Sequence, residues 1–311
     1  MKRVASCFAL SVAASLLPLC ANAQSFRAYV ASYGSDSNPG CSVTAPCRLL
    51  PAALNAIGSG GEVWMLDSAN FNTGTVNVNK NANILAVPGQ VGSIVAVASS
   101  PAISLGAALS LSLRNVAIVN NATNPGTDGV VMSTGTLSVD DSLIAVNGSG
   151  ILDDGAGIVS VHNATFRGGT TGIWARGGAS VAVSRSKFFN TSYAVYVEGS
   201  TPGVITVASV HDSAFSKYYI GAGAVATVSS ATAKITVLGS TFSEGTYGVV
   251  SQSNTSGAIA VASVGSSQAF ANATAGFFQF AGGATFESLG NNLVRGNANN
   301  AVGVITPVSG L

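Results

Sequence analysis

The sequence predicts an all-β solenoid that follows a short helix, and three observations lead to this fold class. Short apolar segments recur from residue 109 onward with spacings of 22 to 28 residues. Inside each repeat, the apolar, polar and glycine positions keep fixed distances from one large apolar residue. The composition favours strands and tight turns over helices, because 37 glycines are present and only 8% of the 311 residues are charged. We therefore expect stacked β-coils that share one core.

Eight large apolar residues, one in each repeat, end a short strand and are called markers below. The markers are Ile118, Ile144, Phe166, Phe188, Phe215, Phe242, Phe270 and Val294. Apolar residues precede most markers by seven and five positions, a small or polar residue precedes them by two, and a glycine usually follows by six. Odd offsets share one face of a strand, so the change to an even offset predicts a bend about three residues before the marker. A β-sandwich, the alternative fold, does not explain constant offsets in repeats of variable length.

The first 23 residues have the three regions of a signal peptide. Lys2 and Arg3 form the positive start, residues 4–19 are apolar, and residues 21–23 provide a small-x-small cleavage site. The apolar stretch of about 16 residues is shorter than the roughly 20 residues that a membrane span needs, and no later stretch is long enough. We therefore expect cleavage near Ala23, no membrane span in the mature protein, and a secreted or periplasmic location.

The mature chain is expected to divide into a cap and a solenoid. Residues 24–61 are predicted to form the N-terminal cap, with a helix over residues 46–57 whose apolar side chains recur at helical spacing and which Gly58 ends. Residues 62–311 are predicted to form a parallel β-helix of about 9–10 coils. One short amphipathic helix ahead of a strand-rich region fits a cap, because the first coil of a solenoid needs cover.

Signal cleavage would leave two cysteines, Cys41 and Cys47, in an oxidising compartment. We expect a disulfide between them, because a catalytic thiol would need a histidine and none is nearby in the sequence. Of the 13 basic residues, Lys2 and Arg3 leave with the signal peptide, so 11 basic residues face 12 acidic ones and the net charge is near −1. Such a chain offers no basic surface to a phosphate backbone, so nucleic acid is not an expected partner.

The repeat pattern and the N-terminal segment together carry a family resemblance. The repeat reads V-x-V-x-x-S-x-F-x5-G, as in residues 181–188. The opening contains YVASYGSDSNPG (29–40), APC (45–47), AALNA (52–56) and GGEV (60–63). The coil length and the repeat pattern resemble the right-handed parallel β-helix of the pectate-lyase-like superfamily, and the opening is similar to that of many secreted β-helix repeat proteins. The resemblance covers essentially the whole mature chain and implies an all-β, right-handed parallel β-helix (solenoid) with a short N-terminal capping helix.

The resemblance is specific for fold and not for activity, because the superfamily holds lyases, hydrolases, esterases, binding modules and adhesins. The vWiDH and RxPxxR signatures of pectate lyases are absent, as are those of pectin methylesterases. Of the NTD, DD, GHG and RIK motifs of polygalacturonases, only DD pairs occur, at residues 140–141 and 153–154. The resemblance therefore implies none of these activities for this chain.

A column of polar residues stands four positions before the markers and is the candidate catalytic site. Its members are Arg114, Asp140, His162, Ser184 and His211, and the next position holds Asn115, Asp141, Asn163, Arg185 and Asp212. Equivalent positions of a parallel β-helix stack about 4.8 Å apart, so Asp140, His162 and Arg185 are expected on one stripe. A carboxylate, an imidazole and a guanidinium together suit proton abstraction next to a uronate carboxylate. The pattern also fits an exposed polar stripe, because turns favour Asn and Asp.

A candidate carbohydrate-binding platform stands eight positions after the markers. The flanking residues there should face the core, so Trp174 and Tyr196 would face outward on adjacent coils, with Arg176 and Glu198 beside them. Aromatic rings beside charged groups commonly bind sugars, because the apolar face of a sugar packs on the ring while its hydroxyls reach the charges. Ordinary surface packing or a protein contact is the alternative.

Asp153, Asp154 and Asp128 are the candidate metal ligands. Their carboxylate oxygens would suit calcium, but loop Asp pairs are common and usually solvated. We expect no bound cofactor or metal, with calcium as the one ion that this group would suit.

These features predict an exported β-helix protein that binds a polysaccharide or a cell-surface component. One alternative is an acidic-polysaccharide lyase or hydrolase that uses the polar set of Asp140, Asp141, His162 and Arg185. Another alternative is a structural or adhesin-like surface protein, which the low charge and the many Ala, Ser, Gly and Val residues favour. The sequence indicates no particular oligomeric state.

For the enzyme alternative, we expect His162→Ala and Arg185→Ala to abolish the formation of unsaturated uronates from pectate or alginate, because both groups would act on the reacting sugar. The variants should stay folded, and the ultraviolet absorbance of the product measures the reaction. A binding module would instead lose affinity on Trp174→Ala and keep it on His162→Ala.

Overall fold

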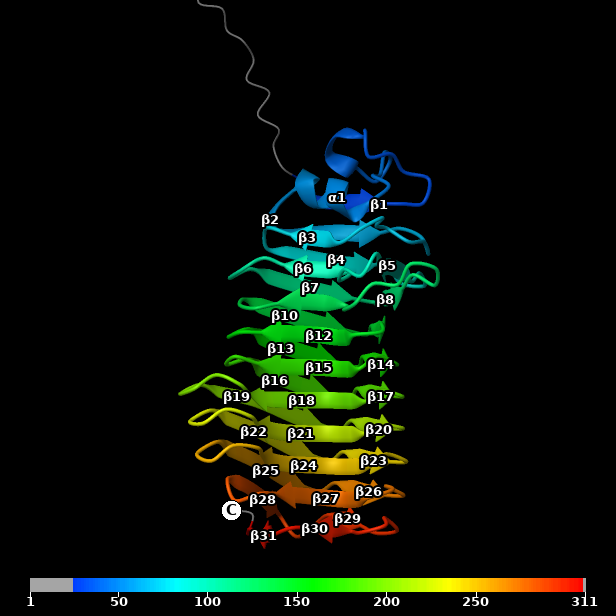
Figure 1. Ribbon diagram of the computed structural model, residues 1–311. Helices are drawn as coiled ribbons and strands as arrows, with labels where there is room; N and C mark the ends of the chain where they lie inside the picture. The colour runs from blue at the N-terminus through cyan, green and yellow to red at the C-terminus, as the bar shows by residue number, and fades with distance from the viewer. Residues whose placement is uncertain (1–24, 310–311) are drawn as a thin grey trace, which may run out of the picture.

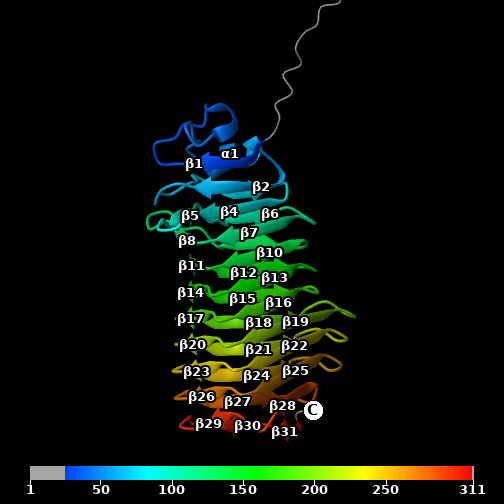
Figure 2. The same cartoon turned by 180° about the vertical axis from the view of Figure 1, so that it is seen from behind.

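Three parallel sheets wind around one core in the computed structural model, which describes residues 25–309 (Figure 1). Successive coils lie on one another in a straight stack, from the blue cap to the red C-terminal coil, and Figure 2 shows the same order from behind. Strands of adjacent coils pair in parallel throughout the stack. The predicted all-β, right-handed parallel β-helix is confirmed, and the predicted signal peptide lies outside the described residues.

The 12-stranded sheet runs the full length of the stack and includes the strand that precedes the helix. In spatial order its strands are β1 (Ser25–Val30), β2 (Ile57–Met65), β4 (Ala82–Ala86), β7 (Ser110–Arg114), β10 (Thr136–Asp140), β13 (Ile158–His162), β16 (Ser180–Ser184), β19 (Ile205–His211), β22 (Thr232–Leu238), β25 (Ile259–Gly265), β28 (Ala284–Ser288) and β31 (Ile305–Pro307). Between β1 and β2 lie the 3-10 helix η1 (Pro39–Cys41) and the helix α1 (Leu50–Ala56).

The other two sheets complete the triangular coil. The 9-stranded sheet contains β5 (Gly92–Ala96), β8 (Val116–Asn120), β11 (Leu143–Ala145), β14 (Thr165–Arg167), β17 (Lys187–Phe189), β20 (Ala214–Ser216), β23 (Thr241–Ser243), β26 (Gln268–Phe270) and β29 (Leu293–Val294). The 10-stranded sheet contains β3 (Val76–Val78), β6 (Ile103–Leu105), β9 (Val130–Met132), β12 (Ser149–Asp154), β15 (Thr171–Arg176), β18 (Tyr193–Gly199), β21 (Ile220–Ala226), β24 (Tyr247–Ser253), β27 (Ala275–Phe280) and β30 (Ala301–Val302).

The short helix α1 covers the N-terminal end of the core. Its Leu50, Ala53 and Leu54 are buried within the same apolar cluster as the coils. Strand β2 begins at Ile57 directly after the helix, so the first strand of the solenoid starts inside the segment predicted as cap. In the described part of the chain, no helix is long and apolar enough to span a membrane.

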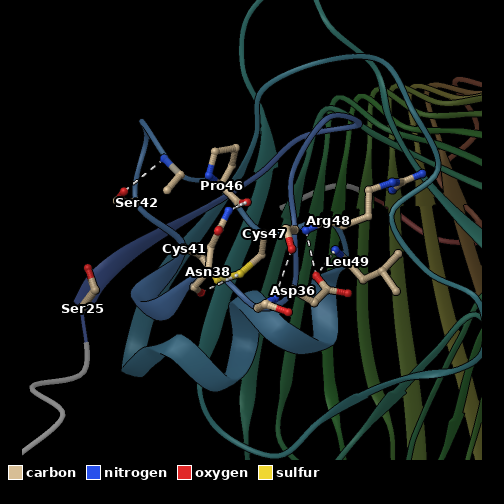
Figure 3. Close-up of a disulfide and its surroundings, with 12 residues drawn as sticks. Ser25, Asp36, Asn38, Cys41, Ser42, Pro46, Cys47, Arg48 and Leu49 are labelled. Carbon is tan, nitrogen blue, oxygen red and sulfur yellow. Dashed lines mark hydrogen bonds between the residues drawn. A yellow bond between two sulfur atoms is a disulfide. The ribbon is translucent and has the colours of Figure 1, made fainter.

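A disulfide and a carboxylate hold the loop ahead of α1 (Figure 3). Cys41 and Cys47 form the predicted disulfide, with their Cα atoms 4.9 Å apart and both residues buried. Oδ1 of Asp36 accepts hydrogen bonds from the N–H groups of Arg48 and Leu49, at 2.8 Å each. These two residues therefore stay outside the helix, which is why α1 begins four residues later than its predicted start at position 46.

A residue in the left-handed backbone conformation forms the bend between the 12-stranded and 9-stranded sheets in five successive coils. The φ angles lie between 49° and 54° at Asn115, Asp141, Asn163, Arg185 and Asp212. The bend predicted three residues before the marker is confirmed. Asn and Asp tolerate this conformation because their short polar side chains hydrogen-bond locally, and Arg185 is the one member without that preference.

Buried serines form a ladder beside this bend. Its members are Ser142, Ser186, Ser213, Ser240 and Ser267. Each Oγ donates a hydrogen bond to the carbonyl oxygen two residues earlier, at 2.6 to 3.0 Å. Each Oγ also accepts the N–H of the equivalent residue in the preceding coil, at 3.1 to 3.2 Å. The serine two positions before the marker thus pairs a buried backbone donor at the turn, which would otherwise be costly.

Four phenylalanines stack inside the core under the 9-stranded sheet. The ring centroids of Phe166, Phe188, Phe215 and Phe242 lie 4.5 to 4.9 Å apart, with planes within 9° of parallel. A Cβ atom at Gly172 would lie 2.8 Å from the ring of Phe188 and closer still to the carbonyl oxygen of Ala194. Glycine recurs six positions after the marker because the backbone of the next coil, and in the stacked coils its phenylalanine ring, approaches closely.

The marker assigned to Phe270 is wrong by one residue. Ala269 pairs with Phe242 in the 9-stranded sheet, whereas Phe270 is 41% exposed. The pattern misleads here because a small core residue stands beside a large surface residue. Phe277 and Phe286, whose rings lie 4.9 Å apart, fill the core of the last coils.

We expect Phe188→Ala to lower the free energy of unfolding by about 3–5 kcal/mol, because it opens a cavity within the ring stack. The adjacent Phe189→Ala should change it by no more than about 0.5 kcal/mol, since Phe189 is 39% exposed and Phe188 only 1%. Urea denaturation followed by circular dichroism measures both values. Equal losses in the two variants would contradict the packing described here.

Candidate functional site

Seven aromatic side chains form a continuous strip on the outer face of the 10-stranded sheet. The aromatic strip consists of Trp174, Tyr196, Tyr193, Tyr219, Tyr247, Phe278 and Phe280. In this order, consecutive ring centroids lie 4.8 to 6.2 Å apart. The rings come from coil after coil because equivalent outward positions stack in register, as Trp174 with Tyr196 and Val250 with Phe278.

A groove of about 380 Å³ opens within the strip. Six of the seven rings line it, together with Ile220, Val225 and Val250 and the amides of Gln252 and Asn254. Gly223 stands in register between Tyr196 and Val250 and adds no side chain to this face. The lining is aromatic and aliphatic with a few amide and phenol groups, which is the composition of sites that take small or polymeric organic ligands.

Charged residues surround one end of the strip. Nε1 of Trp174 donates a hydrogen bond to Oε2 of Glu198 at 2.9 Å, and the guanidinium of Arg176 lies 4.7 Å from the centroid of the indole. Arg176 also pairs with Asp154, with Nε 2.6 Å from Oδ1. The four residues predicted as a carbohydrate platform, Trp174, Arg176, Tyr196 and Glu198, therefore lie together on one face.

The phenols of Tyr196 and Tyr219 stay protonated at neutral pH. Burial raises the pKa of Tyr196, and the charge of Glu198 and the neighbouring Tyr193 add to the increase. Burial also raises the pKa of Tyr219, with further contributions from Tyr247 and Tyr193. Each phenol can therefore donate a hydrogen bond to a ligand oxygen.

Three tyrosines of the strip were not among the residues predicted from the sequence. Tyr193 and Tyr247 follow the markers Phe188 and Phe242 by five positions, and Tyr219 follows its marker by four. The sequence signal was therefore present in a second column, which the search for residues eight positions after the marker did not include.

The polar stripe on the 12-stranded sheet has the predicted register. Asp140 pairs with Arg114 on one side and with His162 on the other, and His162 pairs with Ser184. Asp141 and Arg185 follow at the left-handed bend. The stripe thus exists on a different sheet from the aromatic strip.

The side chains of the polar stripe are engaged locally. Ser138 donates to Asp140 at 3.0 Å, and Nδ1 of His162 lies 2.9 Å from the hydroxyl of Ser184. Asp141 accepts from Asn163 at 2.8 Å and lies 3.6 Å from the guanidinium of Arg114. Among residues 25–309, no side-chain hydrogen bond or ion pair joins two members of the set formed by Asp140, Asp141, His162 and Arg185.

The three aspartates considered as calcium ligands do not converge. Asp153 points into the core, whereas the next residue, Asp154, points outward and binds Arg176. Oδ1 of Asp128 accepts the N–H of Ser149 at 2.6 Å. Within the described residues, no cluster of three His, Cys, Asp or Glu side chains is arranged to hold a metal ion.

Asp153 is a buried carboxyl group without a partner. It is 0% exposed, and neither oxygen has a hydrogen bond within the described residues. Burial raises its pKa to about 7, and the charge of Asp154 adds to the increase. The backbone amides of Gly157 and Gly155 lower the pKa of Asp153, although neither forms a hydrogen bond of good geometry with the carboxyl group.

A comparison with family profiles identifies the repeat region. The profile described as "Right handed beta helix region" matches residues 101–306. The chain belongs to the right-handed β-helix family. No curated protein sequence matches the chain.

Solved structures share the fold at low sequence identity. A pectate lyase superposes with a TM-score of 0.54 at 13% identity, covering 87% of this chain and 79% of the lyase. A pectin methylesterase from Aspergillus niger gives a TM-score of 0.43 at 12% identity, covering 84% of each chain. The profile match and the superposition on the pectate lyase confirm the predicted pectate-lyase-like fold.

We expect Asp153→Asn to change how stability depends on pH. A carboxyl whose pKa rises on folding stabilises the protein fully below its unfolded pKa of about 4, and this contribution is lost as the pH rises through the folded pKa. From about pH 4 to pH 7, the free energy of unfolding of the wild type should therefore fall relative to Asp153→Asn, by on the order of a few kcal/mol.

Denaturant titrations at four pH values measure this difference. Asp212→Asn is the matched control, because Asp212 is exposed at a bend where Asn is equally suited. Parallel curves for the wild type and Asp153→Asn would contradict the burial of the charge.

Proposed function

We propose that this protein binds a polysaccharide along the aromatic strip, as an exported protein without catalytic function at that site. The observation that carries the proposal is the unbroken row of seven rings, six of which line a groove of about 380 Å³. A flat aromatic ring packs against the C–H face of a pyranose, while phenol and amide groups reach the sugar hydroxyls.

The arrangement of the strip favours an extended ligand. Its rings come from β15, β18, β24 and β27 and from the residue ahead of β21, so they follow the axis of the stack. A chain of sugars lying along this axis would contact one coil after another. The polar groups of Gln252 and Asn254 at the groove would fix its orientation.

The charges favour a neutral polysaccharide. The groove is lined by no charged residue. At the end of the strip, Arg176 is neutralised by Asp154, and Glu198 adds a negative charge. An acidic polymer would therefore find no unpaired cation at this site and would be repelled by Glu198.

The state of the nearby carboxylates favours binding over hydrolysis. A glycosidase uses two carboxyl groups that flank the scissile bond. At the strip, Asp154 is held by Arg176, and Glu198 accepts hydrogen bonds from Trp174 and Thr227. Both groups serve to position the aromatic platform.

Export is supported by two features. The Cys41–Cys47 disulfide is typical of proteins that fold in an oxidising compartment. The first 23 residues have the composition of a signal peptide. A secreted or periplasmic location would bring the strip into contact with cell-wall or environmental polysaccharides.

We expect Trp174→Ala and Tyr247→Ala each to weaken binding of a neutral oligosaccharide by about tenfold, because each removes one stacking ring. Isothermal titration with xylohexaose and cellohexaose measures the affinity, and hexagalacturonate tests the preference for a neutral chain. Phe189→Ala is the matched control, since this exposed ring lies on the 9-stranded sheet in the same coil as Tyr196.

A second variant tests the groove without removing a ring. Gly223→Leu should place a side chain between Tyr196 and Val250 and weaken binding by a similar factor, with a small shift of Ile220, whose Cγ2 lies 3.1 Å from the new Cβ. Affinity that is unchanged in all three strip variants would overturn the proposal, as would turnover of the oligosaccharide by the wild type.

A further inference from the structure

Both tryptophans of the chain stand in the same arrangement of side chains. Nε1 of Trp64 donates to Oε2 of Glu62 at 3.0 Å, and the guanidinium of Arg27 lies 3.9 Å from the centroid of its indole. Tyr29 meets the indole edge-on, with centroids 6.3 Å apart and planes at 69°. Trp174 has the matching partners, with its tyrosine at 6.2 Å and 70°.

The arrangement around Trp64 lies on the 12-stranded sheet, at the N-terminal end of the stack. Arg27 and Tyr29 are on β1, Glu62 and Trp64 are on β2, and the register pairs Arg27 with Glu62 and Tyr29 with Trp64. These four residues are called the N-terminal platform. All four are partly exposed on the outer face of the 12-stranded sheet, whose first two strands, β1 and β2, lie at the N-terminal end of the stack (Figure 2).

We propose that the N-terminal platform is a second carbohydrate-binding site, which takes one or two neutral pyranose units. The inference takes its class of ligand from the proposed function but stands on separate residues. The indole and the stacked guanidinium provide a flat surface for the C–H face of a sugar. The Arg27–Glu62 pair is neutral as a unit, so it suits hydroxyl groups better than a charged sugar.

Hydrogen-bonding capacity remains in this ion pair. Oε2 of Glu62 accepts from Nε of Arg27 and from Trp64, and Nη2 of Arg27 lies 2.7 Å from the same oxygen. No hydrogen bond within residues 25–309 reaches Oε1 of Glu62. The side chains of Glu62 and Arg27 are 24% and 37% exposed, so a sugar hydroxyl finds a carboxylate acceptor beside the aromatic surface.

Strand pairing alone does not explain these residues. On β4 and β7, the positions in register with Glu62 hold Asn83 and Ser112. The positions in register with Trp64 hold Leu85 and Arg114. These strands pair in the same register without an indole, and no ion pair joins β4 to β7 within the described residues. The platform is therefore specialised relative to the rest of its sheet.

Single-tryptophan variants separate the two sites. In Trp174→Phe the remaining indole reports on the N-terminal platform, and in Trp64→Phe it reports on the aromatic strip. We expect a saturable change in fluorescence when Trp174→Phe is titrated with xylohexaose or cellohexaose. Adding Glu62→Gln should weaken that titration by about tenfold, because it replaces a charged acceptor with a neutral one.

The controls use the same sheet. Glu287→Gln is the matched change, since Glu287 lies in the same column as Glu62 on β28, near the C-terminal end of the sheet, and accepts a hydrogen bond from Ser263. Arg27→Lys keeps the charge but loses the planar group, and it replaces Glu62→Gln if that variant melts early by circular dichroism. No saturable change in Trp174→Phe, or one that neither platform variant weakens, would overturn the inference. A saturable fluorescence change seen only in Trp64→Phe would overturn this inference and leave the proposed function intact. No fluorescence change in either variant would overturn both the inference and the proposed function.

Discussion

The backbone of every coil is hydrogen-bonded to the coils on either side, and this parallel register organises the whole molecule. Because equivalent residues of successive coils fall on one another, each structural role becomes a column along the stack. The stacked phenylalanines, the serine ladder and the left-handed residues at the bend are three such columns. The aromatic strip combines neighbouring columns on the solvent side, which is how short segments far apart in sequence produce one extended surface.

The columns also explain why the fold was predictable. Offsets from the marker locate the buried serine, the bend and the close-packed glycine because each offset corresponds to a fixed position in a coil. The prediction failed at Phe270 because the larger of two neighbouring residues was taken as the core residue. The register shows that Ala269 is the residue that faces inward. The start of α1 was also missed, because it depends on hydrogen bonds from Asp36 across the loop, and such contacts leave no periodic signal.

The candidate site was predictable in part for the same reason. Trp174 and Tyr196 face outward because side chains alternate along a strand, and the charged residues beside them follow from the same alternation. The ring contributed by Tyr219 lies just before β21, where alternation does not apply. Side chains alternate along β12, so counting from the buried Ile151 would have placed Asp153 in the core. The sequence instead suggested a solvated loop, because two adjacent aspartates are typical of loops and a carboxyl group in the core has no partner. The polar stripe has its predicted register, yet its side chains are satisfied by near neighbours, which only coordinates reveal.

Because every coil repeats the same pairing with its neighbours, such a molecule can change in length by whole coils. Each coil carries its own core residue, its own turns and its own outward positions, and it pairs with the coils directly above and below. Duplicating one coil would therefore lengthen the outer face by about 4.8 Å without altering the geometry at either end. The number of coils, rather than the shape of one pocket, therefore sets the length of polymer that the outer face can contact.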